Sequence, residues 1–145
     1  MTDRVWTDAE YDTMEWHDAA IHGLRFIEGL HGLGEFVLDI DYITECNKVG
    51  DRFNVFYLPA TLTFHKVSNL RMTLDYACTS AGFTPFSIDG IERRAEKRPG
   101  YTAYIWKIPI NWPCGVISFE ATGFEQQSRG EPRLSDTASL KPDDR

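Results

Sequence analysis

The sequence predicts one domain built mainly of antiparallel β-strands. Three observations lead to this prediction: apolar and polar residues alternate over short stretches, turn residues separate these stretches, and aromatic residues make up 13% of the chain. A chain of 145 residues with 42% hydrophobic residues is also long and apolar enough to bury one core. We therefore expect residues 1–127 to form a sandwich, a rolled sheet or a partial barrel of about seven or eight strands.

The N-terminal stretch is the one place where a short helix is expected. Thr7 and Glu10 have the spacing of a capping box, in which each side chain accepts a hydrogen bond from the backbone N–H of the other residue. Few apolar residues follow, so we expect the helix to end near Glu15. From Ala20 the pattern changes to a period of two, which favours a strand.

The clearest strand covers residues 36–43. Side chains on a strand point alternately to opposite faces, so one set of residues shares an apolar face that we expect to be buried: Phe36, Leu38, Ile40 and Tyr42. The same alternation predicts that Asp39 and Asp41 point outward into solvent.

Turn residues divide the rest of the chain. We expect a turn near Asn47 to Asp51, a loop from Ala77 to Pro85, and further strands at residues 53–58, 61–65, 70–76, 86–95, 101–110 and 116–121. Polar residues, Gly and Pro dominate residues 128–145, which we expect to be a loosely ordered tail.

Charge and cysteine content exclude several classes of function. The net charge of −7 makes nucleic acid a poor partner and is compatible with a basic protein partner. Cys46, Cys78 and Cys114 are far apart, so neither a disulfide framework nor a zinc site is expected, and no cofactor is predicted. No apolar run is long enough for a membrane helix and the first residues do not resemble a secretory signal, so we expect a cytoplasmic protein.

The most tempting polar cluster is Trp16, His17 and Asp18, followed by His22. An imidazole beside a carboxylate is suited to act as a base with its orienting partner, or as part of a metal site. The alternative is structural: Asp18 bonds to the backbone and His17 packs beside Trp16. A metal site would need about three ligands, and this pattern supplies a third only if the strand bends, so no metal is predicted.

Asp39, Asp41 and Glu45 form a second candidate group, an acidic row on one strand face. We regard it as a candidate surface for a basic protein partner. The spacing of Asp39 and Asp41, about 7 Å along a strand, also resembles that of a glycosidase acid pair. A solvated strand face with no further role explains the same pattern.

Four short segments carry a family resemblance: Trp16-His17-Asp18, residues 22–26 (His-Gly-Leu-Arg-Phe), residues 38–43 (Leu-Asp-Ile-Asp-Tyr-Ile) and residues 59–64 (Pro-Ala-Thr-Leu-Thr-Phe). Over residues 16–125 the chain resembles small, uncharacterised bacterial β-rich proteins similar to the immunity proteins of polymorphic toxin systems. The resemblance implies a non-enzymatic bacterial protein that binds and neutralises a partner such as a basic toxin. It implies no catalytic residues. Two alternatives remain: a small-molecule-binding or hydrolytic domain that uses the polar cluster, and a structural domain that self-associates through a sheet edge.

Overall fold

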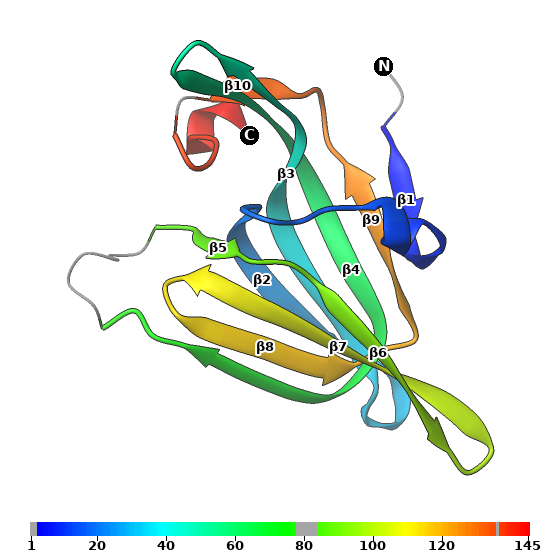
Figure 1. The fold of residues 1–145 in the computed structure, drawn as a ribbon. Helices are drawn as coiled ribbons and strands as arrows, with labels where there is room; N and C mark the ends of the chain where they lie inside the picture. Colours follow the sequence, from blue (N-terminus) through cyan, green and yellow to red (C-terminus); the bar gives the residue numbers. More distant parts are fainter. Residues whose placement is uncertain (1–2, 78–83, 136) are drawn as a thin grey trace.

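Ten strands and three short 3-10 helices make up the part of the chain that the computed structural model describes, residues 3–77, 84–135 and 137–145 (Figure 1). In chain order the elements are β1 (Val5–Thr7), η1 (Asp8–Thr13), β2 (Ala20–Glu28), η2 (Leu30–Gly32), β3 (Gly34–Val49), β4 (Arg52–Leu74), β5 (Phe86–Ile88), β6 (Glu92–Arg98), β7 (Tyr101–Trp112), β8 (Gly115–Glu120), β9 (Gly123–Ser128), β10 (Arg133–Ser135) and η3 (Pro142–Asp144). The predicted antiparallel, mainly β character is confirmed, with ten strands where seven or eight were expected.

Strand β4 is the spine of the sheet. On one side it pairs along most of its length with β3. On the other side it pairs in turn with β10, β9 and β8, which follow one another along its length. Lys66 has a positive φ angle of 51° between the stretches paired with β9 and β8, and Asn69 has one of 52° at the register shift between Ser68 and Arg71, so the strand bends there. Pro59 lies between the stretches paired with β10 and β9.

The strands form one sheet that curls on itself (Figure 1). Its pairings run from β4 through β3, β2, β5 and β7 to β8. The path returns to β4, with which β8 also pairs, but β5 contributes only two residue pairs to each of its neighbours. The sheet is curled and is not a closed barrel.

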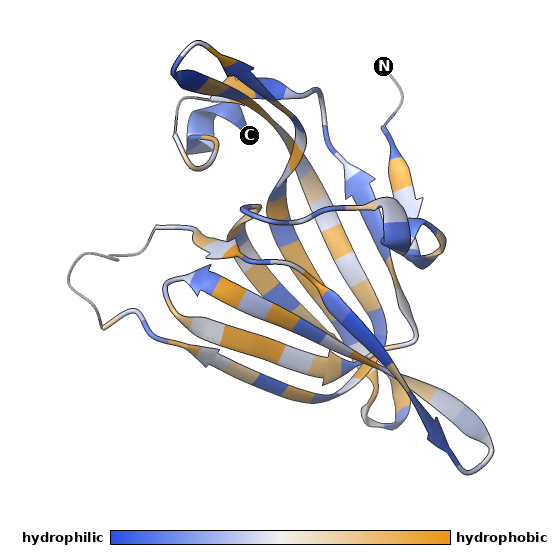
Figure 2. Cartoon of the chain, viewed as in Figure 1, coloured by the Kyte–Doolittle hydropathy of each residue, from blue (hydrophilic) through white to orange (hydrophobic). Residues whose placement is uncertain are grey.

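The inner face of the curled sheet holds an aromatic core. Hydrophobic and hydrophilic residues alternate along the strands (Figure 2), as the period-two pattern predicted. Phe36, Leu38, Ile40 and Tyr42 are all buried, which confirms the face predicted for residues 36–43. They share the core with large side chains from other parts of the chain, among them Trp6, Trp16, Phe64, Trp106, Phe119 and Phe124. Each such side chain contributes about 1.5–3 kcal/mol when it is fully buried.

The expected N-terminal helix is a 3-10 helix, not an α-helix. The capping box forms as predicted: Thr7 N donates to Glu10 Oε2 over 2.6 Å, and the Thr7 side chain caps the helix. η1 nevertheless spans only Asp8–Thr13 and buries none of its residues, so it lacks the apolar face that would support an α-helix. No helix in the described residues has the length and apolarity that a membrane crossing requires.

The last part of the chain has defined structure. Residues 133–135 form β10 against β4, and Pro142–Asp144 form η3. Leu140, within the stretch predicted as a tail, is only 2% exposed. Most of the loop expected at Ala77 to Pro85 lies outside the described residues, and so does Cys78.

Candidate functional site

An open groove of about 350 Å³ lies between η1, the chain that follows it, and the turn that joins β5 to β6. We call it the acidic groove. Its lining includes four exposed carboxylates: Asp12, Glu15, Asp89 and Glu92. Tyr11, Met14, Trp16, Ile91 and Pro109 add apolar surface. The described residues that line the groove include no Lys or Arg.

Contacts between distant parts of the chain fix the walls of the acidic groove. The Tyr11 hydroxyl donates a hydrogen bond of 2.6 Å to the Ile91 carbonyl, which ties η1 to the β5–β6 turn. Trp16 donates from Nε1 to the Gln126 side-chain oxygen over 2.8 Å in the core. The Arg93 guanidinium stacks on the Tyr11 ring, 4.4 Å from its centroid, and so places one positive charge against this wall of the groove.

His17 and Asp18 lie beside the acidic groove. Asp89 connects the two places, because it lines the groove and also contacts His17. His17 Nδ1 is 2.9 Å from the Asp89 carbonyl oxygen, and His17 Nε2 is 3.5 Å from Asp18 Oδ2. The hydrogen bond to the Asp89 carbonyl and the negative charge of Asp18 raise the pKa of His17 above its ordinary value. Asp18 adopts a positive φ of 66° and accepts a hydrogen bond from Asn111, so neighbouring residues 17 and 18 do not alternate across a flat strand.

His22 does not join this group. Its Nε2 atom lies 2.6 Å from Asp41 Oδ2, on a different part of the sheet. The sequence cluster of Trp16, His17, Asp18 and His22 is therefore divided between two places. Trp16 lines the acidic groove and His17 and Asp18 lie beside it, whereas His22 belongs to the site around Asp41.

The expected exposure of Asp39 and Asp41 is wrong for Asp41. The two residues do lie on the opposite face of β3 from the core side chains, but Asp41 is completely buried and the side chain of Asp39 is 37% exposed. The physical reason is that residues 137–145, which we call the covering segment, pack over this face. The Leu140 backbone N–H donates to Asp41 Oδ2 over 2.8 Å.

Arg145 of the covering segment binds both carboxylates. Its Nε donates to Asp41 Oδ1 over 2.8 Å, and its two terminal nitrogens donate to the Asp39 carboxylate over 2.7 and 2.9 Å. Arg145 also donates to the Ile40 carbonyl over 3.1 Å. Arg129 forms a further ion pair with Asp39. We call Asp39, Asp41, His22 and Arg129 the carboxylate site, and Arg145 is its present occupant.

Electrostatics keep both carboxylates ionised. Burial opposes ionisation of Asp41, but hydrogen bonds from His22, the Leu140 N–H and Arg145 outweigh it and lower the pKa of this carboxyl. Burial likewise opposes ionisation of Asp39, and Arg145 together with Arg129 lowers its pKa. The site thus holds two negative charges, balanced by the two guanidinium groups.

Glu45 does not complete an acidic row with Asp39 and Asp41. The register of β3 against β4 shifts between Ile43 and Glu45, and Glu45 instead accepts a hydrogen bond of 2.7 Å from Asn47. Sequence reasoning missed Arg145 and Arg129 because both lie in a stretch read as a tail. A single arginine in a polar stretch is too common a pattern to have identified them.

Nothing in the described residues indicates a metal centre, since they contain no group of three or more His, Cys, Asp or Glu side chains placed to hold a metal ion. Cys46 and Cys114 are free and exposed. Comparison with protein-family models and with curated protein sequences gives no match for this chain.

Proposed function

We propose that the chain is a non-enzymatic protein-binding domain that receives a basic surface of its partner in the acidic groove. The observation that carries the proposal is the lining of that groove, where four exposed carboxylates surround an apolar floor. Protein interfaces combine an apolar centre that loses its water with a polar rim that sets the orientation of the partner. The net charge of −7 adds a long-range attraction for a basic partner.

The exposed position of His17 and Asp18 favours binding over hydrolysis. Their side chains are 54% and 60% exposed, so water surrounds them and weakens their interaction. His22, the third polar member of the predicted cluster, is engaged by Asp41. In a binding surface, by contrast, Asp18 adds another negative charge beside the groove.

The charge of β6 disfavours the alternative of self-association through a sheet edge. This strand lies at one end of the sheet order, and its seven residues include six charged ones: Glu92, Arg93, Arg94, Glu96, Lys97 and Arg98. Charged side chains on an edge strand discourage pairing with a second copy.

The resemblance to immunity proteins points to the same class of function. It implies a bacterial, cytoplasmic protein whose partner is a toxin, and a basic toxin fits the charge of the groove. The proposal requires that the partner be a protein, because nucleic acid is repelled by the same carboxylates that attract basic side chains.

The proposal is tested by neutralising the groove. The probe is a fluorescent eight-residue peptide of alternating Arg and Leu, and the variant carries Asp12→Asn, Glu15→Gln, Asp89→Asn and Glu92→Gln. At about 0.5 kcal/mol for each exposed charge pair, loss of four charges should weaken binding about 30-fold at low salt. Fluorescence anisotropy measures the dissociation constant.

A matched control variant removes the same number of negative charges elsewhere. Glu28→Gln, Asp51→Asn, Glu125→Gln and Glu131→Gln are all exposed and lie outside the groove lining. In this control variant the binding of the peptide should weaken by less than threefold, because the net charge changes and the groove does not. Equal losses in the two variants would contradict the proposal and indicate attraction by net charge alone.

A further inference from the structure

We propose that the carboxylate site is a second partner-binding site, specific for an arginine side chain, and that the covering segment occupies it as an intramolecular competitor. In the structure Arg145 fills the place that a partner's arginine would take. The inference is independent of the acidic groove, because it rests on different residues.

The chemistry of the site selects a guanidinium group. Asp39 and Asp41 present oxygens to three different nitrogens of Arg145, and the Ile40 carbonyl accepts from one of them as well. A planar guanidinium offers several N–H donors in a fixed fork, whereas a lysine ammonium is a single point charge. The geometry therefore favours arginine over lysine.

The charges of the site require one guanidinium beyond Arg129. Asp39 and Asp41 carry two negative charges, and Arg129 compensates one of them. If Arg145 leaves with the covering segment, Asp41 is uncovered and one negative charge remains without a cation. The emptied site then attracts a cation, and a guanidinium that covers the face again regains the charged hydrogen bonds that Arg145 makes.

The covering segment is held at few points, which makes it a replaceable occupant. Leu140 is its only residue with a buried side chain among those described, and Arg145 is its only link to the carboxylates by a side chain. The Thr137 carbonyl accepts a hydrogen bond from the Tyr57 hydroxyl over 3.2 Å. Further hydrogen bonds of the segment are local and link the neighbouring Ser135 to Thr137 and Ser139. Lys141, Pro142 and Asp143 are exposed.

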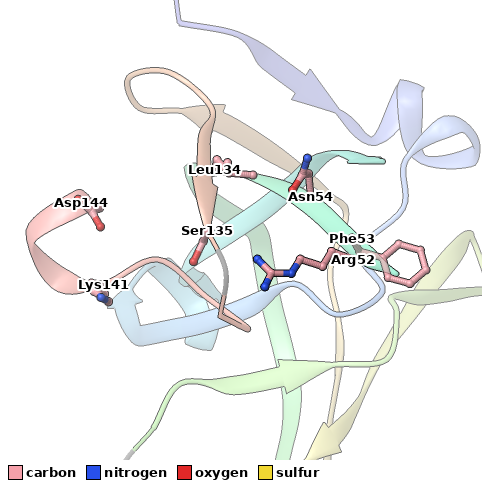
Figure 3. A pocket seen from close by; sticks show the side chains of 7 residues that line it. All are labelled: Arg52, Phe53, Asn54, Leu134, Ser135, Lys141 and Asp144. Atoms are coloured by element: carbon pink, nitrogen blue, oxygen red, sulfur yellow. The ribbon is translucent and has the colours of Figure 1, made fainter. Parts of the chain in front are cut away.

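An open cavity lies beside the covering segment, between two of its residues and the paired ends of β4 and β10. It has a volume of about 720 Å³, with Lys141 and Asp144 on one side and Arg52, Phe53, Asn54, Leu134 and Ser135 on the other (Figure 3). A segment that packs against an open cavity gains less from burial than one that is fully packed. The segment can therefore leave while the strands beneath it stay paired.

The pattern of the segment defines the partner. Its buried leucine and its bound arginine are five positions apart, at 140 and 145. We infer that the partner offers an exposed segment with an apolar residue followed by an arginine at similar spacing, in a conformation that places both on the β3 face.

The test uses the full chain and a peptide copied from it. The probe is a fluorescent peptide with the sequence of residues 137–145, blocked at both ends, and Arg145→Gln in the chain removes the internal competitor's guanidinium. The peptide should bind the Arg145→Gln chain at least tenfold more tightly than the wild-type chain. Adding Asp39→Asn to that variant should remove most of the gain, and a peptide with Gln in place of its Arg should not compete.

Amide hydrogen exchange supplies the second readout. In the Arg145→Gln chain the Leu140 amide, which donates to Asp41, should exchange at least tenfold faster, while amides within β3 and β4 keep their protection. If that variant fails to fold, Arg145→Lys takes its place, and the same two changes should appear in smaller measure. Unchanged peptide binding together with an unchanged Leu140 amide would overturn the proposal. A wild-type dimer that exchanges its covering segments would also overturn it, because the occupant would then be a second copy.

Discussion

The acidic groove and the carboxylate site use the same kind of side chain in opposite environments. In the groove, Asp12 and Glu92 are exposed to solvent. In the carboxylate site, Asp41 is completely buried and has three hydrogen-bond donors within 2.8 Å. A carboxylate in water is available to a partner but adds little stability, whereas a buried and paired carboxylate holds distant parts of the chain together. Charge in the sequence therefore says little about role until burial is known.

The largest expected effect comes from removing the buried carboxylate. Asp41→Ala should lower the free energy of unfolding by about 3 kcal/mol, because His22, the Leu140 N–H and Arg145 lose their common acceptor in a dry environment. Asp12→Ala is the matched change in the groove and should stay within about 0.5 kcal/mol of the wild type. Urea denaturation of both variants measures the difference. Similar losses in the two would show that burial does not separate the two regions.

The two arginines that bind Asp39 should differ as the two regions do: the more buried arginine should contribute more to the free energy of unfolding. The Arg145 side chain is 11% exposed and touches both aspartates, whereas that of Arg129 is 48% exposed and pairs with Asp39 alone. Arg145→Ala should cost about 1–2 kcal/mol of unfolding free energy, since it breaks several charged hydrogen bonds at once. Arg129→Ala should cost about 0.5 kcal/mol or less, as expected for an exposed ion pair. The comparison fails if Arg129→Ala proves the more damaging change.

Acid should weaken the carboxylate site in a defined range of pH. Asp39 and Asp41 have folded-state pKa values below the ordinary value of 3.8. Their contribution to stability is therefore complete above that value and is lost as the pH falls through the lower folded-state values. We expect Asp41→Asn to flatten this acid loss relative to the wild type, in urea unfolding at a series of pH values from 6 down to 2. The prediction is contradicted if the free energy of unfolding falls with the same slope below pH 4 in the wild type and in the variant.

The sequence was sufficient for the parts of the fold that depend on local pattern. Alternation placed Phe36, Leu38, Ile40 and Tyr42 in the core, and spacing identified the capping box of Thr7 and Glu10. It also placed Asp39 and Asp41 correctly on the opposite face of the strand. Burial of Asp41, however, depends on Arg145, which lies 104 positions further along the chain. Alternation describes a strand and carries no information about what covers it.

The acidic groove illustrates the same limit in another way. Asp12 and Glu15 precede the predicted strands, and Asp89 and Glu92 follow a gap of more than seventy residues. They meet because the Tyr11 hydroxyl bonds to the Ile91 carbonyl, a contact that no local signal announces. The sequence did identify Trp16, His17 and Asp18 as a group that stays together. It grouped His22 with them because His22 is only four positions after Asp18. In the structure a β-bulge lies between Ile21 and Gly23, and the side chain of His22 contacts Asp41.

The smallest expected effect is a change in the titration of His17, which reports on the groove alone. The Asp89 carbonyl and the charge of Asp18 raise the pKa of His17, so protonated His17 adds stability below its unfolded value of about 6.5, and this is lost as the pH rises through the folded value. Asp18→Asn removes one of these causes and should lower the pKa of His17, as measured from the imidazole NMR signals across pH. The Arg–Leu peptide should lower it too, because added positive charge in the groove opposes protonation. His22 provides the internal control: its imidazole signals should not move with this peptide, since Asp41 holds it at the other site. If both histidines respond alike, the peptide reaches both sites and the two regions do not act separately.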